Sequence, residues 1–334
     1  MKPLFLGLAG PELSDAERGF FREIEPAGYI LFKRNCVSRA QVRSLTDSLR
    51  DLSGRADVPI LIDQEGGRVA RLQPPEWPAF PAGQRFDALY EIAPISAIEA
   101  ARANAAAIAL TLGEVGVNVD CLPLLDVRRE GAHDIIGDRA LGSDPLRVAS
   151  LGKAVLEGLA AGGVVGVIKH IPGHGRAGAD SHVELPVVTA SRAELEDDLA
   201  PFRKLANAPM AMTAHVVYTA LDPDNCASLS PKIIDEVIRG EIGFDGLLMS
   251  DDLGMQALVG NMAGRAAGVV AAGCDVALHC SGDMAEMVAA AGAVGEIGDA
   301  ARDRLDRAMA GVKLATRDDF AALIEKRDAL LACA

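Results

Sequence analysis

The segment IKHIPGHGRAGADSH, residues 168–182, holds three of the six histidines of this chain together with a lysine. Asp180 and His182 lie one residue apart, close enough for the carboxylate to hydrogen-bond one imidazole nitrogen and leave the other free. Such a pair can donate and accept protons near neutral pH. Two alternatives stay open. The residues could be solvated in a mobile loop, or His174, Asp180 and His182 could hold a metal, although their spacing matches no helical zinc signature.

The sequence LLMSDDLGM places Asp251 and Asp252 at the end of an apolar run. Because successive strand residues face opposite ways, one carboxylate is expected to point into a site and the other elsewhere. An ionised carboxylate there could stabilise a cationic transition state or attack it directly. Asp252 has the alternative role of capping the helix that follows.

A third motif, LIDQEGGRVARL, ends an apolar run with Asp63, and its paired glycines allow a tight turn before Arg68 and Arg71. Asp63 could accept hydrogen bonds from two neighbouring sugar hydroxyls, and an arginine could donate to a ring substituent. The motif DRALGSDP adds Arg139 in another loop, where a surface ion pair is the default interpretation. Lys169 allows a different chemistry, because a lysine on a barrel strand can form a Schiff base, as in an aldolase.

Short apolar runs alternate with Ala- and Leu-rich segments along the whole chain. Continuous hydrophobicity is typical of parallel strands covered on both faces, so the alternation predicts an α/β fold, a (β/α)8 TIM-type barrel. The eight runs are PLFLGLA from residue 3, GYILF from 28, VPILID from 58, VNVDCLPLLDV from 117, VVGVIKH from 164, PMAMTAH from 209, GLLMSDD from 246 and CDVALHC from 274. No linker interrupts them, and we expect a single domain over residues 1–334.

The segments between the runs predict helices. The one that starts at Ser96 predicts a helix with a serine N-cap and a glycine stop. Residues 300–313 predict a closing helix, and residues 318–331 a helical extension of it.

Polar residues follow the ends of the apolar runs, which in a barrel would gather them at one mouth, where the active site is expected. The loop of about residues 171–189 is also long compared with the usual 2 to 6 residues or so of a strand–helix connection, and long loops in barrels often carry function. The polar residues at strand ends are Asp63, Asp120, Lys169, His170, His215, Asp251 and His279.

The composition limits the partners. The chain has 33 Lys and Arg against 47 Asp and Glu, a net charge of −14, and no basic block, so nucleic acids and anionic membranes are poor partners. The apolar stretches look far shorter than the roughly 20 residues of a membrane-spanning helix. The six cysteines show no CxxC spacing, which favours reduced thiols and a cytoplasmic location. We expect no cofactor and no metal requirement.

Taken together, DQEGGRV, DRALGSDP, KHIPGHG followed by DSH, and MSDDLGM resemble glycoside hydrolase family 3, specifically the single-domain bacterial β-N-acetylglucosaminidases of peptidoglycan recycling. The resemblance covers nearly the whole chain. It implies that Asp251 is the nucleophile and that His182, oriented by Asp180, is the general acid/base. It also implies an N-acetylglucosamine site. The residues assigned to that site are Asp63, Arg71, Arg139, Lys169 and His170.

Small departures from the family pattern affect packing more than charge. Ile171 replaces a common phenylalanine, and Ala140 and Leu141 replace a common serine and aromatic residue beside Arg139. These changes bear on fine specificity and leave the implied reaction intact.

The implied activity is that of a retaining exo-β-N-acetylhexosaminidase acting on a small oligosaccharide or muropeptide, with N-acetylglucosamine linked to 1,6-anhydro-N-acetylmuramic acid. Two alternatives remain. A histidine beside the anomeric centre repels anions less than a carboxylate would, so phosphate could replace water and make the protein a phosphorylase. A catalytically silent sugar-binding barrel is the other. The oligomeric state is open, with a monomer among the options.

Overall fold

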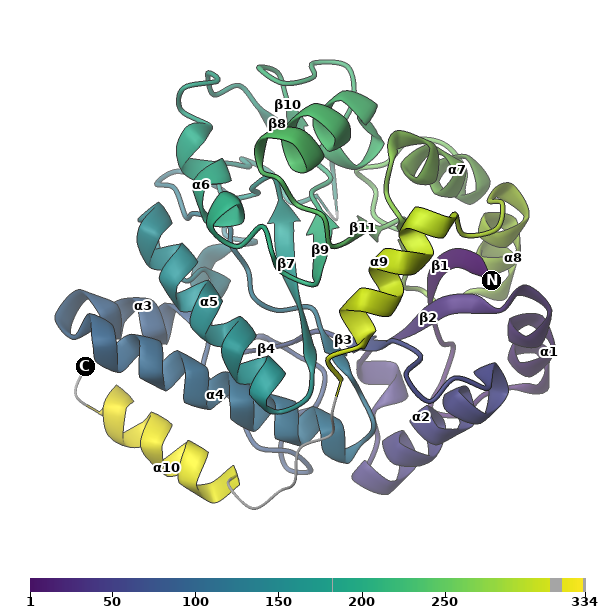
Figure 1. The fold of residues 1–334 in the computed structure, drawn as a ribbon, viewed down its shortest axis with the longest axis horizontal. Helices are drawn as coiled ribbons and strands as arrows, with labels where there is room; N and C mark the ends of the chain where they lie inside the picture. The colour runs from purple at the N-terminus through teal and green to yellow at the C-terminus, as the bar shows by residue number, and fades with distance from the viewer. Residues whose placement is uncertain (182, 313–319, 333–334) are drawn as a thin grey trace.

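The computed structural model describes residues 1–181, 183–312 and 320–332. Its centre is a closed barrel of eight parallel strands, in which each strand pairs with the next barrel strand along the chain and the last pairs with the first (Figure 1). All eight predicted strands are present, which confirms the (β/α)8 barrel. The barrel strands are β1 (Lys2–Gly7), β2 (Pro26–Leu31), β3 (Ile60–Ile62), β6 (Val119–Asp120), β7 (Val165–Ile171), β9 (Met210–Thr213), β11 (Leu247–Asp252) and β12 (Val276–His279).

The barrel interior is a packed apolar core rather than a channel. Phe5, Val167 and Met249 come from different strands and are completely buried inside it. This is why the strands read as continuous hydrophobic runs: one face fills the barrel while the other packs against helices. The helix α9 (Asp299–Met309), the predicted closing helix, lies across the barrel in Figure 1 and adds Leu305 and Met309 to the inner cluster.

Helices surround the strands. In chain order these are α1 (Asp15–Ile24), α2 (Arg39–Ser53), α3 (Gly83–Ile92), α4 (Pro94–Glu114), α5 (Pro145–Ala161), α6 (Glu196–Lys204), the π-helical η4 (Ile233–Glu241), α7 (Met262–Ala272), α8 (Met284–Ala293), α9 and α10 (Phe320–Leu331). The predicted extension of residues 318–331 corresponds to α10, and its first two residues lie outside the described part of the chain.

The helix α4 differs from expectation in two ways. It begins at Pro94 with Ala93 as its N-cap residue, not at Ser96, because proline fits the first turn, where no intrahelical N–H bond is lost. Its 21 residues are also long and apolar enough to cross a membrane, which the sequence argument had overlooked. However, 72% of its apolar window is buried inside the protein, and Figure 1 shows it lying between α5 and α10. It is therefore a core helix of the barrel.

Two small two-stranded sheets lie in the connections outside the barrel. β4 (Gln64–Gly66) and β5 (Val69–Ala70) form an antiparallel pair directly after β3. β8 (Val187–Val188) pairs with β10 (Val217–Tyr218) and so ties down the end of the loop that leaves β7. Between β7 and β8 the chain has no helix or strand among the residues described there, as the loop prediction required.

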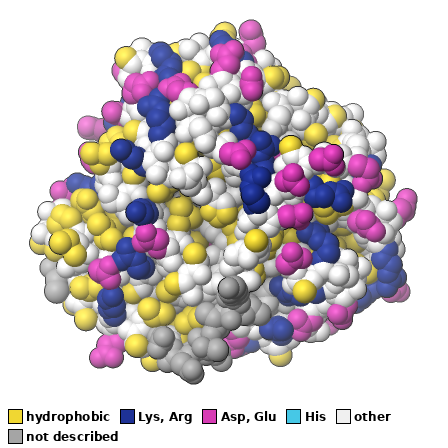
Figure 2. Space-filling model, in the orientation of Figure 1, with side chains coloured by type: hydrophobic (Ala, Val, Ile, Leu, Met, Phe, Trp, Pro, Cys, Tyr) yellow, Lys and Arg dark blue, Asp and Glu magenta, His cyan; other side chains and the backbone are white. Residues whose placement is uncertain are grey.

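The surface carries charges of both signs. On the face shown in Figure 2, Lys and Arg side chains lie among Asp and Glu side chains. Many charged side chains of the protein are paired, including Arg203 with Glu196 at 2.7 Å and Arg304 with Asp245 at 3.0 Å.

Candidate active site

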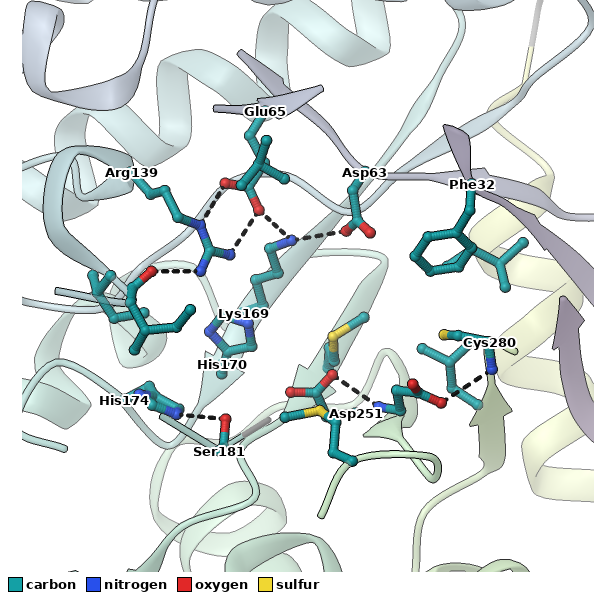
Figure 3. Close-up of a pocket in the computed structure, with 18 of the residues that line it drawn as sticks. Phe32, Asp63, Glu65, Arg139, Lys169, His170, His174, Ser181, Asp251 and Cys280 are labelled. Atoms are coloured by element: carbon teal, nitrogen blue, oxygen red, sulfur yellow. Dashed lines mark hydrogen bonds and ion pairs between the residues drawn. The ribbon is translucent and has the colours of Figure 1, made fainter. Parts of the chain in front are cut away.

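A pocket opens at the C-terminal ends of the barrel strands, the end at which barrel enzymes place their active sites (Figure 3). Its volume of about 330 Å³ suits a ligand of small-molecule size. The pocket brings together residues from β3, β7 and β11 and from the loops between them. The predicted site residues that line it are Asp63, Arg71, Arg139, Lys169, His170 and Asp251.

Lys169 is the centre of one wall of the pocket. It stands near the end of β7, and its Nζ lies 3.1 Å from Asp63 Oδ1 and 2.6 Å from Glu65 Oε1. Burial alone would lower the pKa of Lys169, but attraction to Glu65 and Asp63 outweighs it and holds that pKa above its usual value. The amine is therefore a cation. A Schiff-base nucleophile must be a neutral amine, so this environment opposes the aldolase alternative.

Glu65 was missed by the sequence analysis. Its carboxylate accepts two hydrogen bonds of 2.8 Å from Arg139, and both side chains are largely buried, at 4% and 10% exposed. Burial alone would raise its pKa, but Arg139 and then Lys169 lower it to about 2. The interpretation of Arg139 as a surface ion pair is wrong for this reason. The signal for Glu65 was its i, i+2 spacing from Asp63, which puts both on one side of an extended chain.

The paired glycines form the predicted tight turn. Gly66 and Gly67 have φ values of +97° and +56°, and a Cβ on Gly66 would lie 2.3 Å from the carbonyl oxygen of Pro81. The turn aims Arg71 back into the pocket, where its guanidinium lies 2.9 Å from Asp63 and 4.9 Å from the ring centre of Phe32. Phe32, which sequence reasoning did not select, therefore orients Arg71 by a cation–π contact.

Asp63 completes this wall. Burial alone would raise its pKa, but Lys169 and then Arg71 hold it well below the usual range, so the group is an anion. Each of its two oxygens already accepts one hydrogen bond, from Lys169 and from Arg71 respectively. An ionised carboxylate has about four acceptor positions, so a sugar hydroxyl can still bind to it.

His170 is held from behind by a buried carboxylate. Its Nδ1 lies 2.7 Å from Asp126 Oδ2, while its ring borders the pocket. Asp126 Oδ1 also accepts the backbone N–H groups of His170 and His174, at 3.1 and 2.6 Å. Burial alone would raise the pKa of Asp126, but His170 outweighs it and lowers that pKa to about 2. Asp126, like Glu65 and Phe32, was not selected from the sequence.

The loop after β7 approaches the pocket through Ser181. Its hydroxyl lies 3.2 Å from His174 Nε2, and both side chains are buried and line the pocket. Burial is the main cause that lowers the pKa of His174 to about 4. Asp180 is half-buried beside Ser181. His182 lies outside the described residues, so the Asp180–His182 pair stays a prediction.

The alternative that His174, Asp180 and His182 hold a metal also depends on His182, which lies outside the described residues. Among the residues that the structure describes, no three His, Cys, Asp or Glu side chains are arranged to hold a metal ion. His174 is turned to Ser181 instead. The proposal that the chain needs no metal therefore awaits experiment.

The two adjacent aspartates of β11 have different environments. Asp251 lines the pocket, and its Oδ1 accepts the backbone N–H of Asp252 at 2.8 Å. Asp252 also borders the pocket, but its Oδ1 accepts the N–H groups of Gly254 and Cys280, both at 3.0 Å. The expected helix cap is wrong, because α7 begins ten residues later and its cap is Asn261. Asp252 instead ties β11 to β12.

Three polar residues expected at the mouth are buried around it and do not line the pocket. Asp120 accepts the backbone N–H of Gln64, and burial raises its pKa well above the usual value. His215 contacts Ser228 Oγ at 2.7 Å, and His279 lies 2.9 Å from Glu286 on α8. A shift of one residue along a strand reverses the side it faces, so strand ends alone could not separate these from true lining residues.

Chemically, the pocket combines a buried, hydrogen-bonding wall with a carboxylate on another strand. The wall offers guanidinium, ammonium, carboxylate and imidazole groups, which together can bind several hydroxyl or amide groups of a polar ring. Asp251 approaches from β11 and is placed to act as an anionic group near that ring (Figure 3).

Comparison with known proteins gives a consistent picture. Residues 8–314 match the family model described as the glycosyl hydrolase family 3 N terminal domain. A "Beta-hexosaminidase" of Alkalilimnicola ehrlichii is 41% identical over 284 residues, covering 84% of this chain and 80% of that protein. The one of Bordetella avium is 37% identical with the same coverage.

Solved structures agree with these relatives. Native NagZ from Neisseria gonorrhoeae aligns with a TM-score of 0.86 and 30% identity over 99% of this chain and 96% of that one. A glycoside hydrolase family 3 β-N-acetylglucosaminidase from Paenibacillus sp. str. FPU-7 aligns with a TM-score of 0.87 and 31% identity over 98% of this chain and 67% of that one. From the match over most of its length, this chain belongs to glycosyl hydrolase family 3.

Proposed function

We propose that this chain is a retaining exo-β-N-acetylglucosaminidase that releases terminal N-acetylglucosamine from cell-wall muropeptides of the type N-acetylglucosamine–1,6-anhydro-N-acetylmuramic acid. The observation that carries the proposal is the pocket in which Asp251 borders the same space as the hydrogen-bonding wall of Asp63, Arg71, Lys169 and His170. The relatives named "Beta-hexosaminidase" support the hydrolase activity. A structure of Neisseria NagZ in complex with N-trifluoroacetyl-D-glucosamine supports an N-acylated sugar as the ligand.

The proposed reaction has two steps. Asp251 attacks the anomeric carbon, and the bond to the leaving oxygen breaks as His182 gives that oxygen a proton. Water then attacks the anomeric carbon and passes a proton to His182, while the bond from that carbon to the Asp251 oxygen breaks, which regenerates the carboxylate and releases the sugar. Asp180 orients the imidazole and favours its protonated form. Both steps invert the anomeric centre, so the configuration is retained.

The assay that tests this uses 4-nitrophenyl N-acetyl-β-glucosaminide, with product analysis in the presence and absence of phosphate. Free N-acetylglucosamine of retained configuration under both conditions supports the proposal. A sugar 1-phosphate that forms only with phosphate would make the protein a phosphorylase. Binding of N-acetylglucosamine without turnover would make it a silent sugar-binding barrel. A second assay on muropeptides tests the substrate.

The same assay should be repeated with EDTA and with zinc, because NagZ from Neisseria gonorrhoeae has also been solved in complex with a zinc ion. We expect EDTA to leave turnover unchanged, since the proposed steps use carboxylates and imidazoles alone. Activity that is lost in EDTA and restored by zinc would contradict this expectation.

The proposed location is the cytoplasm, and the proposed partners are sugars only. In support, the five cysteines among the described residues are free, and four of them are buried. Fractionation of cells that produce the chain tests the location, and light scattering of the purified protein would determine the oligomeric state.

A further inference from the structure

We infer that Asp126 is a positioning residue with two separate tasks: it fixes the ring orientation of His170 toward the sugar, and it anchors the base of the loop that carries Asp180 and His182. This inference rests on the proposed function for the identity of the ligand. It assigns a role to a side chain that does not touch the pocket.

The first task follows from the geometry of one oxygen. Asp126 Oδ2 lies 2.7 Å from His170 Nδ1, and Asp126 is completely buried. A carboxylate can only accept, so Nδ1 must carry the proton of this bond. The other nitrogen, Nε2, is thereby left to serve the pocket, and a neutral His170 presents a lone pair to a sugar hydroxyl. A partner behind a functional imidazole commonly selects the tautomer in this way.

The second task belongs to the other oxygen. Asp126 Oδ1 accepts the backbone N–H groups of His170 and of His174, which lie on either side of the turn that leaves β7. A backbone group left unpaired in this buried place would be costly. Four residues after His170, the ring of His174 in turn contacts Ser181, next to Asp180. The buried carboxylate of Asp126 thus connects the wall of the pocket, through His170, to the loop after β7, through His174.

The charge of the group is consistent with both tasks. The guanidinium of Arg139 is paired with Glu65, whereas Asp126 is bonded to the ring of His170, the contact that does most to lower the pKa of the Asp126 carboxyl. The rings of His170 and His174 also make an edge-to-face contact, with their centres 5.6 Å apart.

Two substitutions separate the tasks. Asp126→Asn keeps an oxygen for the two backbone N–H groups but offers an NH₂ group to His170, which must then move its proton to Nε2. We expect KM for 4-nitrophenyl N-acetyl-β-glucosaminide to rise about tenfold, with kcat within about threefold, since one hydrogen bond between His170 and the sugar is worth about this much. Asp126→Ala removes both oxygens and should also lower kcat on an unactivated chitobiose substrate, by about 10-fold beyond the Asn variant.

A spectroscopic readout makes the test independent of activity. In ¹⁵N-histidine-labelled protein, His170 should be protonated at Nδ1 when neutral, and Asp126→Asn should convert it to the Nε2–H form; His170→Asn identifies its signals. The matched control is Asp198→Asn. Asp198 is another buried carboxylate that holds this loop, through Arg176 at 2.6 Å, but no described histidine bonds to it.

The outcomes distinguish a positioning role of Asp126 from a purely structural one. A change of tautomer with a raised KM in Asp126→Asn, absent in Asp198→Asn, supports the inference. An unchanged His170 tautomer, or equal kinetic losses in the two variants, would show that Asp126 is structural only. If the wild-type protein binds N-acetylglucosamine but turns over no glycoside, the proposed function fails, whereas the tautomer and the binding affinity still test Asp126.

Discussion

The wall of the pocket and the loop after β7 are built in opposite ways. In the wall, the side chains of Lys169 and Glu65 are 3% and 4% exposed and bonded to each other. In the loop, Val183 is 64% exposed and Leu185 is 37% exposed. Segments with little burial open at low free-energy cost, whereas buried ion networks open only with the domain. Under the proposed function, sugar recognition therefore belongs to the buried barrel wall, and proton transfer belongs to the more exposed loop after β7.

The largest effect should come from Asp251, the proposed nucleophile, which stands on strand β11. Asp251→Asn should lower turnover by about 10⁴-fold or more, because it removes the charge of the proposed nucleophile with little change in volume. The variant should still fold and bind N-acetylglucosamine, measured by calorimetry. Labelling of Asp252 instead of Asp251 by a mechanism-based fluorosugar would show that the nucleophile is misassigned.

The proposed role of the loop after β7 in proton transfer is tested by a substitution of His182. His182→Ala should lower turnover by roughly 10² to 10⁴ on an unactivated substrate, the usual value of general acid–base catalysis. The loss should be smaller on an activated aryl glycoside, where the deficit moves to hydrolysis of the glycosyl-enzyme and azide should partly restore the rate. Asp180→Ala should give a milder defect of the same kind. Equal losses on both substrates without azide rescue would mean that His182 only binds substrate or shapes the loop.

The wall side is tested by breaking its central ion network. Glu65→Gln should lower the free energy of unfolding by about 3 kcal/mol, because it leaves Arg139 and Lys169 buried with too little negative charge. Urea unfolding measures this. The control is Arg43→Ala, which breaks an exposed pair with Asp47 at 3.0 Å and should cost at most about 1 kcal/mol. Similar changes in the two variants would show that the wall is not held by its charges.

Acid should also lower the free energy of unfolding, because protonation of Glu65 removes the same negative charge. The pKa of Glu65 is about 2 in the folded protein against an ordinary 4.5, so its stabilisation is fully present above the unfolded value. It is lost as the pH falls from about 5 toward 2, where the carboxylate becomes protonated. Urea midpoints at pH 5, 4 and 3 should therefore fall less steeply in Glu65→Gln than in the wild type. Parallel curves would contradict a depressed pKa at Glu65.

The smallest effect is expected at Ser181, and it tests whether this residue acts with the loop after β7 or with the wall of the pocket. Ser181→Ala removes the hydroxyl that contacts His174, a neutral hydrogen bond worth about 1 kcal/mol. We expect kcat on an unactivated substrate to fall about fivefold while the affinity for N-acetylglucosamine stays unchanged. A change in that affinity would show that Ser181 belongs to the sugar wall.

Much of this architecture could be predicted from the sequence, since a parallel strand covered on both faces has a distinctive hydrophobic run. Lys169 and Asp251 could be predicted for the same reason, because each stands at or near the end of such a run. Glu65 and Asp126 each had a sequence signal, one as a neighbour of Asp63 and the other near the end of a predicted strand run. Their roles could not be predicted, since their partners lie 74 and 44 residues away and only the closed barrel brings them together. Arg139 was misjudged for the same reason, as its burial depends on Glu65.

The loop between β7 and β8 also bears on how this barrel tolerates insertions. It is fixed at its start by Asp126 and Arg176 and at its end by the pairing of β8 with β10, and its tip of residues 178–185 lies between these anchors. The entropy of closing a loop grows only with the logarithm of its length, so doubling the tip would cost about 0.6 kcal/mol. The free energy of folding would therefore tolerate a change in the length of the tip, but the tip carries Asp180 and His182, so such a change is expected to act on the proposed proton transfer far more than on stability.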